Sequence, residues 1–198
     1  MTHTMYTVSP QTLSVEIKDA LRYLSINSPD ESTLALTMEC IEEAKGIAVP
    51  KAVYVKSRVK IEGKRVIFDF MEMESENLAK FLDGYCEAYI FVATIGIRAD
   101  MLVNRYLKSL PSKGVLFNAS CVAVIESFCD RLNLYLTDGR YKVRRYSPGY
   151  GDLSIEYQRE LLKYLDAERK IGVTLTEGSL MVPTKTVSAI IGIPKSAK

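Results

Sequence analysis

The sequence predicts an α+β fold: a central twisted sheet of antiparallel or mixed strands, with flanking helices and one long buried helix. Apolar residues recur at helical spacing in several segments and alternate with a period of two in others. The two kinds of segment do not follow one another as regular βαβ units, which argues against a doubly wound parallel sheet. The longest helical segment, Lys113–Leu136, is apolar nearly all round in its first half, as is typical of a helix at the centre of a fold.

Two helices are expected near the N-terminus. The first has an apolar stripe at positions i, i+3, i+4 and i+7, made of Ile17, Ala20, Leu21 and Leu24. The second should begin at Ser28, which can act as the N-cap, with Pro29 at the first helical position and Glu31 completing a capping box. It should run to about Lys45 and bury one side, made of Leu34, Met38, Ile41 and Ala44.

From Ala52 the hydrophobic period changes to two, which predicts a β-hairpin that turns at residues 62–64 and returns over Arg65–Phe70. Three further elements are expected after it: a short helix at Asn77–Leu82, a buried strand at Ala88–Thr94 and a helix at Ala99–Leu107. Within the long helix, one set of side chains should form the core: Phe117, Cys121, Ile125, Phe128 and Leu132.

The last part of the chain should return to the sheet. The expected elements are a strand at Arg140–Tyr146, a loop, a helix over about Ile155–Glu168 and strands near Val173–Thr176 and Thr186–Ile191. No repeat, low-complexity segment or long linker divides the sequence. Residues 1–198 are therefore expected to form a single domain, with residues 1–12 as a flexible tail or arm.

The composition excludes several classes of function. Lys and Arg exceed Asp and Glu only by 26 to 24, so no basic field indicates a nucleic-acid surface. His3 is the only histidine, which excludes multi-histidine metal sites and any nucleophile that needs a core histidine as its base. The four cysteines lack CxxC spacing and are interpreted as small buried hydrophobes rather than metal ligands: Cys40, Cys86, Cys121 and Cys129.

Neither the opening sequence nor the most apolar stretch indicates a membrane segment. The opening sequence, MTHTMYTVSP, lacks the basic and apolar regions of a signal peptide. The most apolar stretch, Val115–Ile125, falls well short of the roughly 20 residues that a membrane-spanning helix needs. We therefore expect a cytoplasmic protein without a membrane partner.

The most distinctive chemistry lies in the segment Arg144–Asp152, RRYSPGYGD. Glycines let a backbone approach a ligand closely, and exposed N–H groups at the start of the next helix attract anions. Arginine offers a planar fork for a carboxylate, and tyrosine can stack on a ring or face a cation. Together these groups suit a small ligand with a carboxylate, an aromatic base and a positive centre. The plain alternative is a tight strand-to-helix turn with two solvated arginines.

Two patterns in this region occur in a fixed order. The loop reads R-x-x-P-G-Y at Arg145, Pro148, Gly149 and Tyr150. One helix later, an L-T-E-x-x-x-M-x-P-x-x-S-V-S-like stretch is matched by Leu175, Thr176, Glu177, Met181, Pro183, Thr186, Val187 and Ser188. The order and spacing resemble the activation domain of cobalamin-dependent methionine synthase. With FVATIG and FCDRL further upstream, the resemblance covers most of the chain and is strongest over Arg145–Ile193.

The resemblance implies a fold like that activation domain and the binding of S-adenosylmethionine. In the family, a flavodoxin-like protein supplies an electron to inactive cob(II)alamin, and methyl transfer from S-adenosylmethionine restores methylcobalamin. The chain would thus be a reactivation module of a methyltransferase system, with no catalytic residue or metal of its own. Its partner would be a cobalamin-binding methionine synthase, through which alone it meets cobalamin. Two alternatives stay open: a docking module without chemistry, or the reactivation partner of another corrinoid methyltransferase.

The resemblance also implies roles for individual residues. Arg145 would grip the carboxylate of S-adenosylmethionine, and backbone groups around Tyr146 and Ser147 would hold the adenine or ribose. Gly149 would allow a close approach of the ligand, and Tyr150 would lie beside the ligand or the corrin face.

Other features are less closely matched. Glu177 is a candidate partner for the ligand's ammonium group, with a neighbouring backbone group or arginine as its alternative partner. The family's tyrosine-containing final strand is not matched, because the sequence stops at IPKSAK. The cobalamin-binding D-x-H-x-x-G motif is also absent, since His3 lies in T-H-T. The chain is therefore expected to act as a free-standing module on a separate corrinoid protein.

A set of tyrosines is a candidate docking surface or, alternatively, ordinary packing: Tyr141, Tyr146, Tyr150, Tyr157 and Tyr164.

Overall fold

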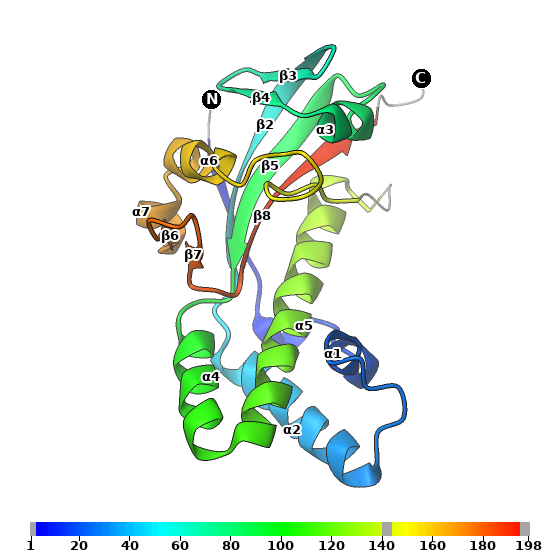
Figure 1. The fold of residues 1–198 in the computed structure, drawn as a ribbon, viewed down its shortest axis with the longest axis vertical. Coiled ribbons are helices and arrows are strands. Elements are labelled where there is room, and N and C mark those ends of the chain that lie inside the picture. The colour runs from blue at the N-terminus through cyan, green and yellow to red at the C-terminus, as the bar shows by residue number, and fades with distance from the viewer. Residues whose placement is uncertain (1–2, 140–143, 195–198) are drawn as a thin grey trace.

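A computed structural model describes residues 3–139 and 144–194 of the chain. Figure 1 shows an elongated molecule whose upper part holds the sheet and whose lower part is helical. The long helix α5 (Pro111–Leu136) runs from the lower part up to the sheet and links the two. The α+β fold class predicted from the sequence is confirmed.

Within the described residues, six strands form one sheet, in which β5 pairs with β2 on one side and β8 on the other. Its order is β4-β3-β2-β5-β8, with β1 pairing with β2 outside this path, and every pairing in it is antiparallel. The strands are β1 (Thr4–Thr7), β2 (Lys51–Glu62), β3 (Arg65–Phe68), β4 (Glu72–Glu74), β5 (Glu87–Thr94) and β8 (Thr186–Ile193). A separate two-stranded ribbon is made of β6 (Thr174–Leu175) and β7 (Met181–Val182).

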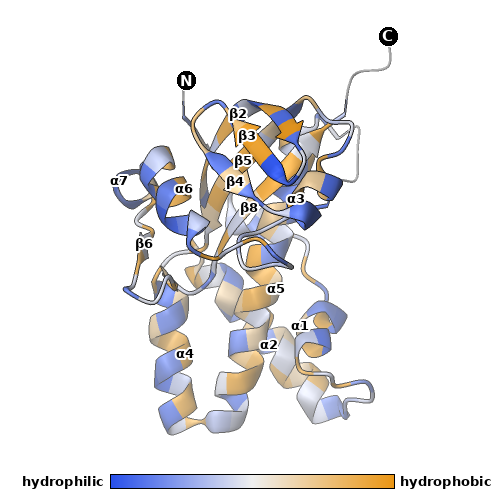
Figure 2. Cartoon of the chain, turned by 45° about the horizontal axis from the view of Figure 1, so that its top comes forward, coloured by the Kyte–Doolittle hydropathy of each residue, from blue (hydrophilic) through white to orange (hydrophobic). Residues whose placement is uncertain are grey.

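Strand β5 is buried on both faces, and this explains its nearly continuous apolar sequence. Phe91 and Ala93 belong to the core that contains α5, whereas Ile90 and Val92 belong to a second core on the opposite face. A strand covered on both faces has no wet side and therefore loses the alternation that marks a half-exposed strand. Figure 2 shows many hydrophobic residues along the strands, whereas hydrophobic and hydrophilic residues are mixed along the helices.

The first core contains the long helix, and its predicted core residues are confirmed. Phe117, Cys121, Ile125, Phe128 and Leu132 are all buried. Three further helices belong to this part of the molecule: α1 (Ile17–Tyr23), α2 (Glu31–Ile47) and α4 (Arg98–Ser109). A short 3-10 turn (Pro10–Thr12) precedes α1.

The predicted start and buried side of α2 were partly wrong. Asp30, not Ser28, is the N-cap, because its side chain accepts a hydrogen bond from the Thr33 backbone N–H at 2.7 Å. The helix then turns a different face inward: Met38 is 56% exposed and Leu34 lies at the surface. The buried residues are Thr37, Cys40, Ile41 and Ala44. The Thr37 hydroxyl donates to the Thr33 carbonyl, so a polar residue is buried here with its hydrogen bond satisfied.

The second core lies under α3 (Glu76–Phe81), α6 (Tyr157–Leu165) and α7 (Ala167–Ile171). The sequence predicted one helix over Ile155–Glu168, but Asp166 adopts a left-handed conformation with φ 54° and separates α6 from α7. Residues 140–143 of the predicted strand Arg140–Tyr146 lie outside the described residues. At its end, Tyr146 forms an isolated antiparallel bridge with Ile190 of β8.

Two further expectations concern the N-terminal arm and the cysteines. Residues 4–7 of the expected tail or arm form β1 and pair with residues 51–54 of β2. Cys40, Cys121 and Cys129 are buried as predicted, but Cys86 is exposed, because it lies just before β5 where the chain reaches the surface. Its interpretation as a buried hydrophobe was wrong.

The crossing of α4 and α5 depends on Gly114. A Cβ atom at this position would lie 2.7 Å from the Leu107 backbone nitrogen and 2.9 Å from the Leu107 Cα. We expect Gly114→Ala to lower the free energy of unfolding by about 1–3 kcal/mol, because the two helix backbones must separate. Urea unfolding at neutral pH measures this change.

Gly46 provides the matched control, because it lies in α2 and a Cβ there would meet nothing within 4 Å. Gly46→Ala is expected to raise the free energy of unfolding by about 0.5–1 kcal/mol through helix propensity alone. Equal effects of the two substitutions would show that the close approach of α4 and α5 is unimportant for stability.

Candidate functional site

The segment 144–152 crosses from one face of the sheet to the other. It follows α5 in the sequence, pairs with the edge of β8 through Tyr146, and leads into α6. Two glycines make the turn possible, since Gly149 has φ 91° and Gly151 has φ 55°, conformations that favour glycine. The Gly149 N–H donates to the Leu153 carbonyl at 2.8 Å, which closes the loop. We call residues 144–152 the crossing loop.

Arg145 is held by two carboxylates of α5. Its Nη1 lies 2.6 Å from Asp130 and its Nη2 lies 2.5 Å from Glu126, and the side chain is only 19% exposed. Glu126 and Asp130 are four residues apart on a helix and therefore share a face. The guanidinium predicted to grip a ligand is thus paired within the protein. The three groups together carry a formal charge of −1.

A hollow of about 440 Å³ lies beside the crossing loop. The crossing loop and the start of α6 supply part of its lining, the ribbon β6–β7 and strand β8 supply most of the rest, and α5 supplies Glu126. The lining residues are Glu126, Ser147, Pro148, Tyr150, Ile155, Gln158, Ser179, Leu180, Met181, Thr184, Thr186, Val187 and Ser188. Ser147, Pro148 and Tyr150 of the crossing loop therefore lie beside a hollow whose volume is in the range of small-molecule sites.

The polar side chains of this hollow are fixed by one another. Gln158 is buried, donates to the Ser179 carbonyl at 3.0 Å and accepts from the Ser188 hydroxyl at 2.9 Å. The Ser179 hydroxyl donates to Glu156 at 3.1 Å. These bonds join α6, the β6–β7 turn and β8, so the hollow has a rigid polar wall.

The structure brings some of the predicted site residues to the hollow and leaves others outside it. Ser147 and Tyr150 line it, and Tyr150 is 68% exposed at its rim. Tyr146 turns away: its ring lies 5.2 Å from that of Phe81, and its hydroxyl donates to the Tyr150 carbonyl at 3.2 Å. Glu177 is exposed on the turn between β6 and β7 and does not line the hollow.

Two of the remaining tyrosines serve packing within the protein. The Tyr157 hydroxyl accepts a hydrogen bond from the Glu74 backbone N–H at 3.0 Å. The Tyr164 ring stacks on Phe70 with 3.8 Å between ring centres. Tyr141 lies outside the described residues. The five tyrosines therefore do not form one surface among the residues that the structure describes.

Sequence reasoning missed Glu126 and Gln158. A signal for Glu126 was present, because Glu126 and Asp130 interrupt a mostly apolar helix at a spacing that places both carboxylates on one face. No comparable signal marked Gln158, which reads as one polar residue of an amphipathic helix. Its role depends on contacts with Ser179 and Ser188, which are far away in the sequence.

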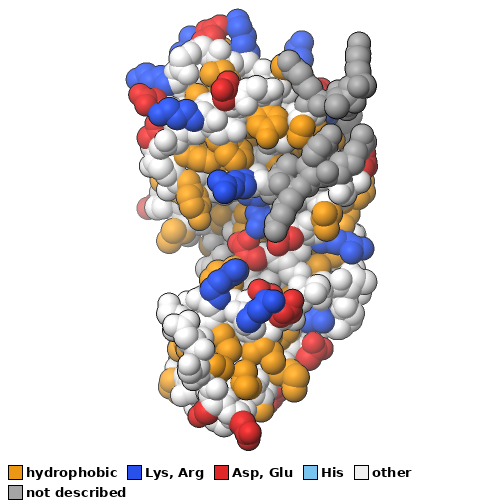
Figure 3. All heavy atoms as spheres, turned by 90° about the vertical axis from the view of Figure 1, so that its right-hand side faces the viewer, with side chains coloured by type: hydrophobic (Ala, Val, Ile, Leu, Met, Phe, Trp, Pro, Cys, Tyr) orange, Lys and Arg blue, Asp and Glu red, His pale blue; other side chains and the backbone are white. Residues whose placement is uncertain are grey.

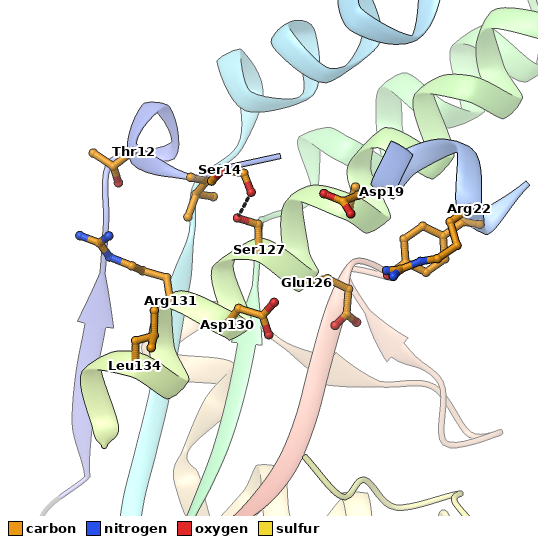
Figure 4. Close-up of a pocket in the computed structure, with 12 residues that line it drawn as sticks. Thr12, Ser14, Asp19, Arg22, Glu126, Ser127, Asp130, Arg131 and Leu134 are labelled. Atoms are coloured by element: carbon orange, nitrogen blue, oxygen red, sulfur yellow. Dashed lines mark hydrogen bonds between the residues drawn. The ribbon is translucent and has the colours of Figure 1, made fainter. Parts of the chain in front are cut away.

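A second hollow, of about 290 Å³, lies between residues 12–23 and α5. Arg145, Glu126 and Asp130 form what we call the Arg145 cluster. Glu126 lines both hollows, so this cluster lies between them. Figure 4 shows Asp130 and Glu126 in the middle of this hollow, with Arg131 and Arg22 towards its two ends. Figure 3 shows side chains of both charges gathered at the waist between the upper and lower parts of the molecule.

Two other kinds of feature, metal-binding clusters and membrane-spanning helices, are absent from the described part of the chain. It contains no group of three or more His, Cys, Asp or Glu side chains that could hold a metal ion. Among the helices that the structure describes, none combines the length and the apolar character needed to cross a bilayer.

Comparisons with known proteins agree with this geometry. Residues 130–198 match the family model of the vitamin B12 dependent methionine synthase activation domain. The fold is similar to a crystal structure of the MetH reactivation domain bound to AdoHcy, with a TM-score of 0.71 and 16% identity over all of this chain and 80% of that one. A search of curated proteins gave no match. The chain therefore has the fold of a methionine synthase reactivation domain and, over residues 130–198, the sequence pattern of the activation domain family.

Proposed function

We propose that the protein binds S-adenosylmethionine in the hollow beside the crossing loop and supports reductive methylation of cob(II)alamin on a partner protein. One observation carries the proposal. The R-x-x-P-G-Y loop lies within the region that matches the family model and forms part of the rim of a hollow of about 440 Å³. This volume lies within the usual range for small-molecule sites. The similar reactivation domain was crystallised with AdoHcy, the demethylated form of the proposed ligand.

The lining of the hollow suits the adenosine part of such a ligand. Pro148, Ile155 and Met181 offer apolar surface for a flat base, while Gln158 and Ser188 place polar groups at fixed positions. Polar groups at fixed positions beside apolar surface are typical of a site that binds and orients a small ligand. Backbone groups around Tyr146 and Ser147 are proposed to hold the adenine or ribose, and Gly149 to allow its close approach.

The Arg145 cluster suits the amino-acid end of the ligand. A guanidinium has five N–H donors, and its contacts with Asp130 and Glu126 leave others for a ligand carboxylate. Glu126 also lines the hollow, and its carboxylate can accept a hydrogen bond from the ligand's ammonium group. We assign the ammonium to Glu126 rather than to Glu177, because Glu126 lines the hollow. Arg145 does not line it, and we propose that it meets the ligand carboxylate beside Glu126, with which it is paired. Both charges of an amino acid are then matched.

The rim of the hollow is suited to docking a partner. Leu180 is 69% exposed, Tyr150 is 68% exposed and Ile155 is 40% exposed, and all three line the hollow. Exposed apolar groups around a ligand site favour a covering surface. We propose that this surface is the corrin face of a cobalamin-binding methionine synthase, so that the ligand's methyl group faces the cobalt. Cobalamin would then be held by the partner alone.

In this reaction the protein's contribution is positioning. S-adenosylmethionine supplies a methyl group activated by a positive sulfur. A donor such as a flavodoxin-like protein would give one electron to cob(II)alamin. The methyl group would then move from sulfur to cobalt, which leaves S-adenosylhomocysteine. The crossing loop and the Arg145 cluster fix the ligand, and the apolar rim excludes water.

A reconstitution experiment tests the whole proposal. The protein is mixed with cob(II)alamin-loaded methionine synthase that lacks its own activation domain, a one-electron reductant and S-adenosylmethionine. We expect the methylcobalamin absorption spectrum to appear only when all components are present. If no spectrum appears but the two proteins still form a complex, the chain is a docking module. If another corrinoid methyltransferase is the client, the spectrum appears with that protein instead.

Arg145 provides the sharpest test of the ligand site. We expect Arg145→Ala to weaken the binding of S-adenosylmethionine by about 2–3 kcal/mol, roughly 30- to 150-fold, because a charge-assisted hydrogen bond to its carboxylate is lost. Titration calorimetry of the protein alone measures the dissociation constant. Arg145→Lys should recover part of the affinity, since it keeps the charge but not the fork.

Arg144 is the matched control, because it is the exposed neighbour of Arg145. Arg144→Ala should leave the dissociation constant within about twofold, as expected for an exposed charge. Circular dichroism must show that both variants are folded. An unchanged dissociation constant in folded Arg145→Ala would reject the proposed contact.

A further inference from the structure

The crossing loop ends at Asp152, whose carboxylate is bound to a distant part of the chain. One oxygen accepts from the Ser75 hydroxyl and from the Asn77 backbone N–H at 3.2 Å. The other accepts from the Glu76 backbone N–H at 2.7 Å. These three donors lie where the chain enters α3, on the face of the sheet opposite to α5. The loop is thus tied to a helix that precedes it by about 75 residues.

The contact requires a carboxylate. Three donors converge on two acceptor oxygens, and an aspartate can satisfy all of them. An asparagine of the same shape would turn its NH₂ group towards one of the donors, so at least one hydrogen bond would be replaced by a donor–donor contact. The Ser75 hydroxyl and the two backbone N–H groups lower the pKa of the Asp152 carboxyl, which therefore stays ionised at neutral pH.

Other contacts place the crossing loop against the same helix. A Cβ atom on Gly151 would lie 2.5 Å from the Asn77 side-chain nitrogen and 2.8 Å from the Tyr146 hydroxyl, so the loop backbone lies directly on α3. Phe81, at the end of α3, packs against Tyr146. At its other end the loop is held by Arg145, which pairs with α5. Its middle, with Ser147 and Tyr150, faces the hollow.

We propose that Asp152 is a positioning residue of the ligand site: its hydrogen bonds to residues 75–77 hold the crossing loop in the conformation that binds S-adenosylmethionine. Asp152 itself does not line the hollow. Without this anchor the first part of the loop is still held at Arg145 and Tyr146, but its last residues are no longer hydrogen-bonded to the start of α3 and sample other conformations. The inference rests on the proposed function for its ligand, but the ordering of the loop by Asp152 is testable without one.

The experiment compares the full-length protein with its Asp152→Ala and Asp152→Asn variants. We expect both to bind S-adenosylmethionine about tenfold more weakly in titration calorimetry. If the loop holds the binding conformation only about a tenth of the time, the apparent dissociation constant rises about tenfold. Hydrogen exchange should be faster in residues 146–151 and at the start of α3 but unchanged in α5. Saturating ligand should return the exchange of the loop to the wild-type level, which loss of a merely structural contact would not predict.

Asp83 provides the control, because it is an exposed carboxylate just beyond the end of α3. Asp83→Asn should change neither the dissociation constant nor the exchange of the loop. The proposal is overturned if folded Asp152→Ala binds as tightly as wild type, or if exchange rises equally in α5. If Asp152→Ala does not fold, the isosteric Asp152→Asn decides between these outcomes. If wild type itself binds no S-adenosylmethionine, the proposed function fails, and hydrogen exchange alone decides whether Asp152 orders the loop.

Discussion

Burial of the central strand β5 on both faces is the constraint on which the rest of the structure depends. Strand β5 contributes alternate residues to two separate cores, one containing α5 and the other lying under α3, α6 and α7. A sheet covered in this way requires the chain to pass from one layer to the other. After α5 the passage takes place at the edge of β8, where Tyr146 pairs with Ile190. The crossing loop is the result of this topology, and the pairing also protects part of an exposed strand edge.

The same constraint explains why the candidate site lies where it does. A loop that crosses between layers can touch elements of both, and the crossing loop does so at its two ends. Arg145 contacts α5 in the first layer, and Asp152 contacts the start of α3 in the second. The stretch between them is therefore held at two points, while its glycines allow it to turn sharply above the hollow. Binding residues on a loop of this kind are positioned by a rigid scaffold.

Most of the fold could be predicted from the sequence because its long elements have strong periodicity. The core residues of α5 and the hairpin of β2 and β3 follow directly from apolar spacing. The errors have local physical causes. The N-cap of α2 is Asp30 and not Ser28. Both side chains can accept the capping hydrogen bond, so the sequence alone does not decide between them. The short strands β1, β4 and β7 are defined by their partners rather than by a pattern of their own.

The candidate site was predictable only in part, because a motif indicates where a site lies but not which residues its side chains contact. The loop motif located Arg145, Ser147 and Tyr150, two of which line the hollow. It did not indicate that Arg145 is paired with Glu126 and Asp130, since those residues belong to a helix whose pattern reads mainly as core. Gln158 and Asp152 act through residues that are distant in the sequence, and such contacts follow from tertiary structure alone.

The pairing of Arg145 does not close the site to a ligand. A guanidinium without a partner at this depth would be costly, so two carboxylates beside it stabilise the protein while the hollow holds only solvent. These carboxylates are partly exposed, with Glu126 at 36% and Asp130 at 72%, and water weakens their attraction for Arg145. In the proposed complex, the amino-acid end of the ligand would displace that water and add one negative and one positive charge to the cluster. The net charge of the cluster would then be unchanged, and each new charge would meet an opposite one in a drier environment, where their attraction is stronger.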